Sequence, residues 1–217
     1  MFIPLSIAAK NEPDGLAKSC THKCDTLFGL KLGGQGRLTG FSNCNWDCES
    51  DQWNFIHLAN GQRVKTGMKW QCVEYARRWM NVELSHTFTS IDHAYQIWDL
   101  ESAHELGTQK EVKWLKFANG QTREKPQRSD LLIYNKTVGI HGHVAVVVDE
   151  RDGYVLIAEQ NFSNKQWEQK AYARKAKLVK NPQGNYSLSD EGLIGWMRIP
   201  QSPQSPLTSN VQFKMEN

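Results

Sequence analysis

The chain has 217 residues, of which 39% are hydrophobic and 23% are charged, and its net charge is +3. This length and composition are typical of a globular protein with one medium-sized core. No apolar run approaches the roughly 18 residues that a membrane-spanning helix needs, so no membrane span is expected. The small net charge, without a block of lysine or arginine, argues against a nucleic-acid partner.

The two ends of the chain differ in composition from the part between them. The first residues, MFIPLSIAA, are apolar, but they lack the basic stretch of a signal peptide and contain Pro4. A truncated or cleaved signal is the alternative interpretation. Residues 201–217 are rich in proline and serine. We expect an N-terminal extension over 1–24, one folded domain over 25–200 and a disordered tail over 201–217.

The five cysteines divide into an early quartet and one isolated residue. The quartet consists of two pairs, each with three residues between the partners: Cys20, Cys24, Cys44 and Cys48. Two disulfides would indicate an exported protein and four reduced thiols a cytoplasmic one, and the pattern slightly favours disulfides. Zinc knuckles more often have two residues between paired cysteines, so a metal site is the weaker interpretation. We expect neither a metal nor a cofactor.

The expected elements change from helices to strands along the chain. Residues 25–45 are glycine-rich, which predicts loops with short strands. Apolar residues at helical spacing predict a helix that begins near Cys72 and a second helix over 91–98 with Ser90 as its N-cap. Beyond these, a period of two predicts strands at 112–117, 131–134, 143–148, 154–159 and 193–198. The connections between strands are too short for helical crossovers, so we expect an α+β domain with a mostly antiparallel sheet.

The isolated cysteine, Cys72, stands at the start of the first predicted helix, in GMKWQCVEYARRWM. The positive end of a helix dipole stabilises a thiolate and lowers the pKa of the thiol. A lone cysteine on a helix is more often simply buried, so this position alone does not assign catalysis. A nucleophilic thiolate also needs a general base within hydrogen-bonding reach and a group that orients the base.

Among the seven histidines, His143 has the least usual position, because it opens the apolar strand HVAVVV, where an imidazole is costly without a partner. DERDG joins this strand to YVLIAE as a hairpin connection. If the loop is centred on its third residue, Glu159 lies directly opposite His143 and can orient the imidazole. A tight turn at Asp152-Gly153 would place Glu159 opposite Val146, on the other face. We favour the first register, because the second buries a charge among valines. With Cys72 available, we favour catalysis over a purely structural pair.

Five segments in order, WQCVEYARRWM, PQRSDLLIYNK, GHVAVVVDE, IAEQN and LIGWM, resemble the CHAP family (cysteine, histidine-dependent amidohydrolase/peptidase). The similarity covers about residues 28–198 and extends to the amidase domains of glutathionylspermidine synthetase/amidase and trypanothione synthetase. It implies a papain-like or NlpC/P60-like fold in which a nucleophile helix packs on the sheet. The early cysteine pairs depart from the family pattern, and the synthetase half is not expected in this chain.

The resemblance also implies roles for individual residues. It makes Cys72 the nucleophile, His143 the base and Glu159 the group that orients the base. It places Gln71 at the oxyanion position beside the nucleophile, together with the backbone N–H of Cys72.

Two further residues, Arg77 and Asn161, align with positions that recognise the glutathione part of the substrate, for which an arginine fork suits a carboxylate. A surface ion pair for Arg77 and a turn cap for Asn161 are the alternatives. We therefore expect a thiol amidase that cleaves a small-molecule or peptide amide, by resemblance one like glutathionylspermidine, to glutathione and a polyamine. Cleavage of peptidoglycan is the alternative among enzymes, and a catalytically silent binding module is the alternative outside them.

Overall fold

The computed structural model describes residues 20, 22–34, 36–200 and 214–215. Its largest sheet has the spatial order β13 (Tyr186–Ser189), β12 (Arg174–Lys180), β11 (Tyr154–Ala158), β10 (His143–Arg151), β9 (Leu131–Tyr134), β14 (Leu193–Arg198) and β8 (Leu115–Ala118). The smaller sheets are β1 (Lys31–Gly33) with β2 (Gly40–Phe41); β15 (Lys214–Met215), β3 (Trp53–His57) and β4 (Arg63–Met68); and β5 (His86–Thr87), β6 (Ser102–Glu105) and β7 (Glu111–Lys113). All pairings between these described strands are antiparallel. The predicted α+β class is confirmed.

The predicted first helix is confirmed as α1 (Cys72–Trp79), which continues into the π-helical turn η2 (Met80–Leu84). Three 3-10 turns complete the described helices: η1 (Gly36–Leu38), η3 (Ala94–Asp99) and η4 (Lys136–Val138). The second predicted helix is wrong in type and start, since it is the 3-10 turn η3 with His93 as its N-cap. The side chain of Gln96 accepts a hydrogen bond from the backbone N–H of His93 at 2.8 Å, which fixes the later start. None of the described helices is long and apolar enough to cross a membrane.

Several strands differ from the predictions. The predicted strand 112–117 is two strands, β7 and β8, which belong to different sheets. They are separated by the buried Trp114, whose backbone N–H donates to the carbonyl of Glu101. The tail is not entirely without structure, since β15 pairs with β3. The rest of the predicted tail and all of the N-terminal extension except Cys20 and 22–24 lie outside the described residues.

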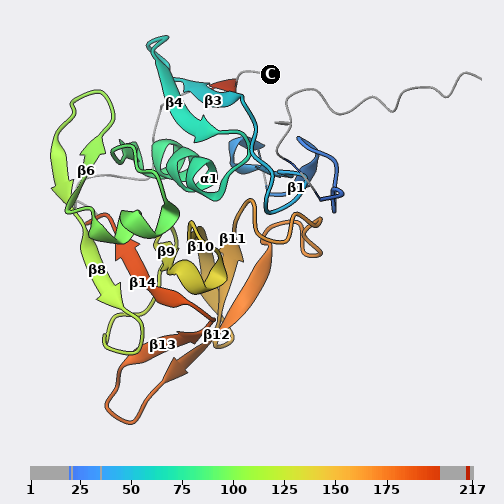
Figure 1. Cartoon of the computed structure of the whole chain (residues 1–217). Helices are drawn as coiled ribbons and strands as arrows, with labels where there is room; N and C mark the ends of the chain where they lie inside the picture. The colour runs from blue at the N-terminus through green and yellow to red at the C-terminus, as the bar shows by residue number, and fades with distance from the viewer. Residues whose placement is uncertain (1–19, 21, 35, 201–213, 216–217) are drawn as a thin grey trace, which may run out of the picture.

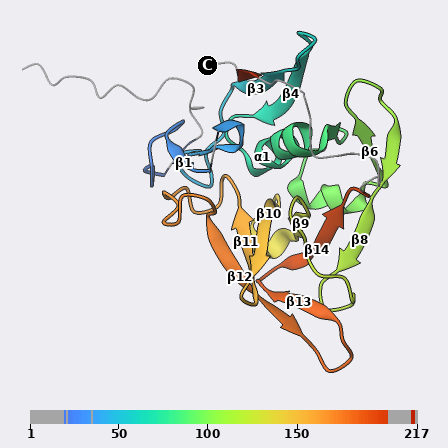
Figure 2. The same ribbon diagram turned by 180° about the vertical axis from the view of Figure 1, so that it is seen from behind.

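Helix α1 lies between the β3–β4 hairpin and the large sheet (Figure 1), and Figure 2 shows the same arrangement from behind. One face of the sheet packs against α1 through Leu131, Ile133, Val144, Val146 and Met197. The opposite face is buried in a second cluster inside the curl of the sheet, with Leu132, Ala145, Val147, Ile157 and Trp196. Because β9, β10 and β11 are buried on both faces, the start of β10 is held rigidly beside α1.

The register of the β10–β11 hairpin differs from the predicted one. Its turn is the tight turn at Asp152-Gly153, both with positive φ, and Arg151 pairs with Tyr154. A β-bulge between Val147 and Asp149 then shifts the register by one residue. Glu159 therefore returns to the face of His143, displaced from it diagonally rather than directly opposite it. The predicted pair is correct in partner and face, but the register that supported it is wrong.

Candidate active site

Cys72 is the first residue of α1, and among the described cysteines it alone has no disulfide. Its side chain is buried, with 9% of the residue exposed. The imidazole of His143 and the backbone N–H groups of Val73 and Val144 lie close enough to the thiol to stabilise its thiolate form. The thiol thus lies where the N-terminal end of α1 meets the start of β10.

Cys72 and His143 change each other's ionisation. Burial by itself would raise the pKa of the Cys72 thiol, but the hydrogen bond and positive charge of His143 hold that pKa below its ordinary value. Burial by itself would lower the pKa of His143, but Cys72 and Glu159 raise it to about 9. The two groups therefore favour the thiolate–imidazolium pair at neutral pH, the form in which a cysteine is nucleophilic.

Glu159 lies one residue beyond the end of β11 and accepts a hydrogen bond from Nε2 of His143 at 3.0 Å. This bond leaves Nδ1 of the imidazole for the thiol. Arg174 on β12 donates to both oxygens of the same carboxylate, at 2.7 Å from Nε and 3.3 Å from Nη2. Burial alone would raise the pKa of Glu159, but His143 and Arg174 hold it below its ordinary value, so the carboxylate stays ionised.

Arg174 is itself fixed by a second acid and by a phenol. Its Nη1 donates to Asp190 at 2.7 Å, and its Nη2 donates to the hydroxyl oxygen of Tyr134 at 3.0 Å. The Tyr134 hydroxyl in turn donates to Asp190 at 2.7 Å. The ring of Phe162, 42% exposed, lies 5.0 Å from the His143 ring and 5.0 Å from the Arg174 guanidinium. The imidazole is therefore held by a carboxylate on one side and covered by an aromatic ring.

Gln71 and Asn161, both predicted site residues, are brought together. Gln71 is the N-cap residue of α1, and its Nε2 donates to the carbonyl of Cys48 at 3.0 Å. Asn161, in the left-handed region with φ 50°, donates from Nδ2 to the Gln71 side-chain oxygen at 2.7 Å. Asn161 thus contacts the residue before the candidate nucleophile, rather than serving as a simple turn cap.

The structure does not bring Arg77 to this group. Its guanidinium is buried on the other side of α1, where it donates to the carbonyls of Thr66 at 2.8 Å and Thr89 at 3.3 Å. The ring of Phe88 packs 4.3 Å from it, and burial lowers the pKa of Arg77 to about 10. These contacts join β4 to the segment after η2 and are not those of a surface ion pair, and the predicted substrate contact of Arg77 stays a prediction.

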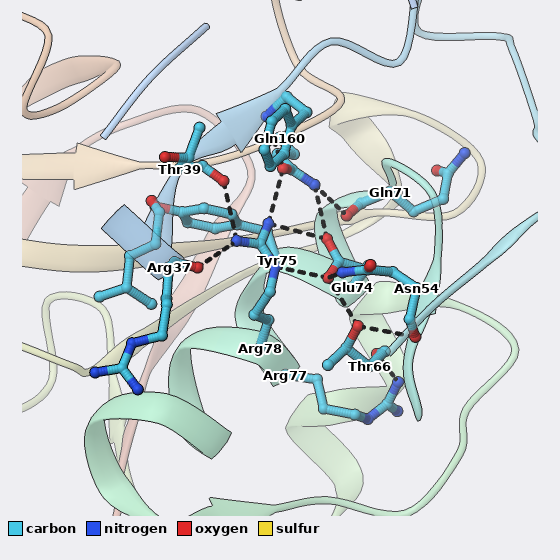
Figure 3. A network of polar contacts seen from close by, with 12 residues as sticks. Arg37, Thr39, Asn54, Thr66, Gln71, Glu74, Tyr75, Arg77, Arg78 and Gln160 are labelled. Atoms are coloured by element: carbon cyan, nitrogen blue, oxygen red, sulfur yellow. Dashed lines mark hydrogen bonds and ion pairs between the residues drawn. The ribbon is translucent and has the colours of Figure 1, made fainter. Parts of the chain in front are cut away.

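A buried polar network anchors the start of α1 (Figure 3). Glu74 and Arg78 form a fully buried ion pair one helical turn apart, with Nε to Oε1 at 2.8 Å. Gln160 accepts from Arg78 at 3.0 Å and donates to Glu74 at 3.0 Å and to the backbone carbonyl of Gln71 at 3.4 Å. Asn54 and Thr66 also donate to Oε1 of Glu74, whereas Gln160 donates to Oε2. The first turn of the helix is therefore bonded to the loop that follows Glu159.

The early cysteines form two disulfides, Cys20–Cys48 and Cys24–Cys44, as the sequence slightly favoured. In the described part of the chain, the sulfur atoms of Cys20, Cys44 and Cys48 lie within 4.8 Å of one another, which is a spacing seen in metal sites. Because all three sulfurs are in disulfides, they offer no thiolate to a metal in this form.

Sequence reasoning missed the residues that support the site rather than those at its centre. Arg174, Tyr134 and Asp190 hold Glu159, while Gln160 and Glu74 hold the helix. Gln160 lies within the AEQN segment, so it could have been suspected from its place between two predicted site residues. The role of Arg174 could not be predicted from the sequence, because β12 has the charged sequence RKAKLVK, which suggests a surface strand.

Comparison with known proteins identifies the central part of the chain. Residues 63–161 match the family model of the CHAP domain. The chain is 32% identical to trypanothione synthetase of Crithidia fasciculata over 163 residues, 69% of this chain and 24% of that protein. It is 33% identical to the bifunctional glutathionylspermidine synthetase/amidase of Escherichia coli K12 over 138 residues, 60% of this chain and 22% of that protein.

The chain thus spans about a quarter or less of the length of these relatives. A CHAP domain implies a papain-like fold, with which a short helix on a curled antiparallel sheet agrees. The matched residues begin at β4 and end at Asn161, so they include the candidate nucleophile, the histidine and the carboxylate. The expected resemblance is confirmed: residues 63–161 match the CHAP domain.

Proposed function

We propose that this protein is a cysteine amidohydrolase in which Cys72 is the nucleophile, His143 the acid and base, and Glu159 the group that orients the imidazole. The single observation that carries the proposal is the buried group of Cys72, His143 and Glu159, in which the imidazole bonds the carboxylate at 3.0 Å and lowers the pKa of the thiol. CHAP domains are amidohydrolases and peptidases, which supports the same chemistry. A silent binding module has no need for a thiolate–imidazolium pair.

The reaction follows from the protonation states of the pair. The Cys72 thiolate attacks the carbonyl carbon of the amide, and the resulting oxyanion accepts hydrogen bonds from the Cys72 backbone N–H and the Gln71 side-chain amide. The His143 imidazolium donates its proton to the leaving nitrogen as the C–N bond breaks, which leaves a thioester. Neutral His143 then takes a proton from water, the hydroxide adds to the thioester carbonyl, and the C–S bond breaks to regenerate the thiolate.

For the substrate, we propose an amide like that of glutathionylspermidine, cleaved to glutathione and a polyamine. The support is the likeness to proteins named as glutathionylspermidine synthetase/amidase and trypanothione synthetase. The runner-up is a peptide bond of peptidoglycan. The two disulfides favour this alternative, because they indicate an oxidising compartment such as the exterior of the cell.

The test compares wild type with Cys72→Ala on both substrates. We expect wild type to release glutathione from glutathionylspermidine and Cys72→Ala to release none above the uncatalysed rate. Loss of turbidity from purified cell walls, with no glutathione release, would assign the runner-up substrate. Hydrolysis retained in Cys72→Ala would refute the nucleophile, and Cys72→Ser serves as the isosteric control for folding.

A further inference from the structure

The loop formed by residues 43–48, which carries one half of each disulfide, lies directly beside Gln71. The carbonyl of Cys48 accepts the hydrogen bond from Nε2 of Gln71, and Cys48 is joined covalently to Cys20. The second disulfide fixes the other end of the loop through Cys44. A cross-linked loop therefore contacts the residue that precedes the candidate nucleophile.

Asn43, at the start of this 43–48 loop, is fully buried and joins three segments of the chain. Its Nδ2 donates to the carbonyls of Asn45, at 3.1 Å, and Cys48 within the loop, and to Oδ1 of Asn161, at 3.1 Å. Its Oδ1 accepts from the backbone N–H of Trp70 at 3.2 Å, two residues before Cys72 in sequence. A single amide side chain thus ties the loop to both sides of the site.

These contacts converge on the side-chain amide of Gln71. Cys48 accepts from its nitrogen, and Asn161 donates to its oxygen. Asn43 donates to both of these partners. The orientation of the Gln71 amide is therefore determined at both ends by groups that Asn43 holds. Since an amide nitrogen carries two hydrogens, one of them stays available for an oxyanion.

We propose that Asn43 is a positioning residue for Gln71 and that the two disulfides hold the 43–48 loop in the geometry that this requires. The inference rests on the proposed function, because it concerns the oxyanion side of the same site. Thiol hydrolases are kept active by reductants that protect the nucleophile, whereas here a dithiol that reduces the disulfides lowers turnover.

A purely structural role for Asn43 makes a different prediction. Loss of a buried hydrogen-bonding residue lowers the free energy of unfolding wherever it occurs in the molecule. Loss of oxyanion stabilisation lowers kcat and kcat/KM together, because the interaction exists only in the transition state. It leaves the reaction of the Cys72 thiolate with an alkylating agent unchanged, since alkylation by iodoacetamide passes through no oxyanion.

The first experiment compares Asn43→Ala with Asn119→Ala in the full chain. Asn119 is a matched control, because its side chain bonds both backbone groups of Leu188 between β8 and β13. For Asn43→Ala we expect kcat to fall about tenfold to a hundredfold, somewhat less than the loss for removing an oxyanion donor outright. KM and the iodoacetamide rate at Cys72 should stay within about twofold, and Asn119→Ala should match wild type. An unchanged kcat, or equal falls in kcat and alkylation, would overturn the inference.

The second experiment tests the disulfides in the double variant Cys20→Ser with Cys48→Ser and in wild type titrated with dithiothreitol. Each disulfide takes two electrons and two protons from the dithiol, which becomes a cyclic disulfide. We expect kcat to fall in both cases, with the iodoacetamide rate at Cys72 retained. Equal or higher turnover in the reduced protein would contradict the role of the loop.

A third measurement separates this inference from the proposed function. The side-chain amide protons of Gln71, followed by NMR, should be slowly exchanging in wild type and rapidly exchanging in Asn43→Ala and in the double variant. Unchanged exchange would refute the positioning role, whatever the activity. If wild type hydrolyses no amide while exchange responds as expected, the proposed function fails and the positioning contact stands.

Discussion

Replacing His143 by alanine removes the partner that keeps Cys72 ionised. In the folded protein, burial opposes the thiolate, and the imidazole outweighs it. Without the imidazole, only the backbone N–H groups of Val73 and Val144 oppose the rise in the Cys72 pKa that burial causes. We therefore expect the pKa of the thiol to return to its ordinary value of about 8.5 or rise above it.

The size of the effect follows from the thiolate fraction. At pH 6.5 a thiol with an ordinary pKa of about 8.5 is about 1% ionised, and the lowered pKa of Cys72 makes the thiolate fraction larger in wild type. If the thiol were fully ionised in wild type, the alkylation rate would exceed that of a thiol of ordinary pKa by about a hundredfold. Because a thiolate of lower pKa is intrinsically less nucleophilic, with a Brønsted slope of about 0.4–0.5, we expect a fall of about tenfold to thirtyfold at pH 6.5.

The assay is the rate of iodoacetamide alkylation at Cys72 between pH 5 and 10, followed by intact mass. Cys72→Ser shows that this residue is the one labelled, and His104→Ala, on β6, controls for the loss of a histidine elsewhere. In His143→Ala the rate should rise with pH through the range of an ordinary thiol. A variant that reacts at the wild-type rate with the wild-type pH profile would refute the ion pair.

Three further predictions concern the groups around this pair. Amide hydrolysis should lose activity on the alkaline side near pH 9, because the raised pKa of His143 keeps the imidazolium below that pH and loses it above, and kcat/KM measured against pH will show the limb. Glu159→Gln should lower kcat about a hundredfold, the scale of general-base effects. Arg174→Met should lower kcat less, and should lower the free energy of unfolding in urea by about 1–3 kcal/mol. Equal kcat in wild type and both variants would contradict the orienting role. Arg77→Met should leave KM unchanged but destabilise the fold by about 1–3 kcal/mol, since the buried carbonyl of Thr66 and the carbonyl of the exposed Thr89 lose their donor; a raised KM without loss of stability would instead restore a substrate contact.

The residues at the centre of the site were predictable because each is anomalous in its local pattern. Cys72 opens a helix, His143 opens an apolar strand, and Glu159 ends the next strand. Their partnership was predicted from a hairpin register that proved wrong. The tight turn at Asp152-Gly153 has the residues that a two-residue hairpin favours, and only the bulge after Val147 restores the carboxylate to the correct face. A bulge inserts one residue into an otherwise regular apolar run, so alternation alone does not reveal it.

The groups that hold Glu159 were not predictable from the sequence. Tyr134, Arg174 and Asp190 come from three separate parts of the chain, and they meet because β12 pairs with β11 and because β9 lies two strands from β11. Arginine in a strand with four charged residues suggests a solvated edge. What makes Arg174 different from its neighbours is the sheet order, which follows from long-range pairing rather than local pattern.

The contacts of the two neighbouring arginines of α1, Arg77 and Arg78, were likewise not predictable from the sequence. The resemblance selected the first of them, Arg77, for substrate binding. In the structure, Arg77 bonds the backbone carbonyls of Thr66 and Thr89, while Arg78 is fully buried against Glu74 and Gln160. One residue on a helix rotates the side chain by about 100°, so a motif places both arginines without saying what either contacts.

Three consecutive residues explain why the AEQN segment carries so much of the site. Glu159 bonds His143, Gln160 bonds the helix pair of Glu74 and Arg78, and Asn161 bonds Gln71. Within a strand, the first and third of these side chains would share one face. Because β11 ends at Ala158 and Asn161 adopts a positive φ, the chain turns and the three side chains diverge. The proposed base, the helix of the proposed nucleophile and the proposed oxyanion side are therefore held relative to one another by one short loop. A displacement of that loop would disturb all three at once, which is why its contacts with the 43–48 loop matter for turnover.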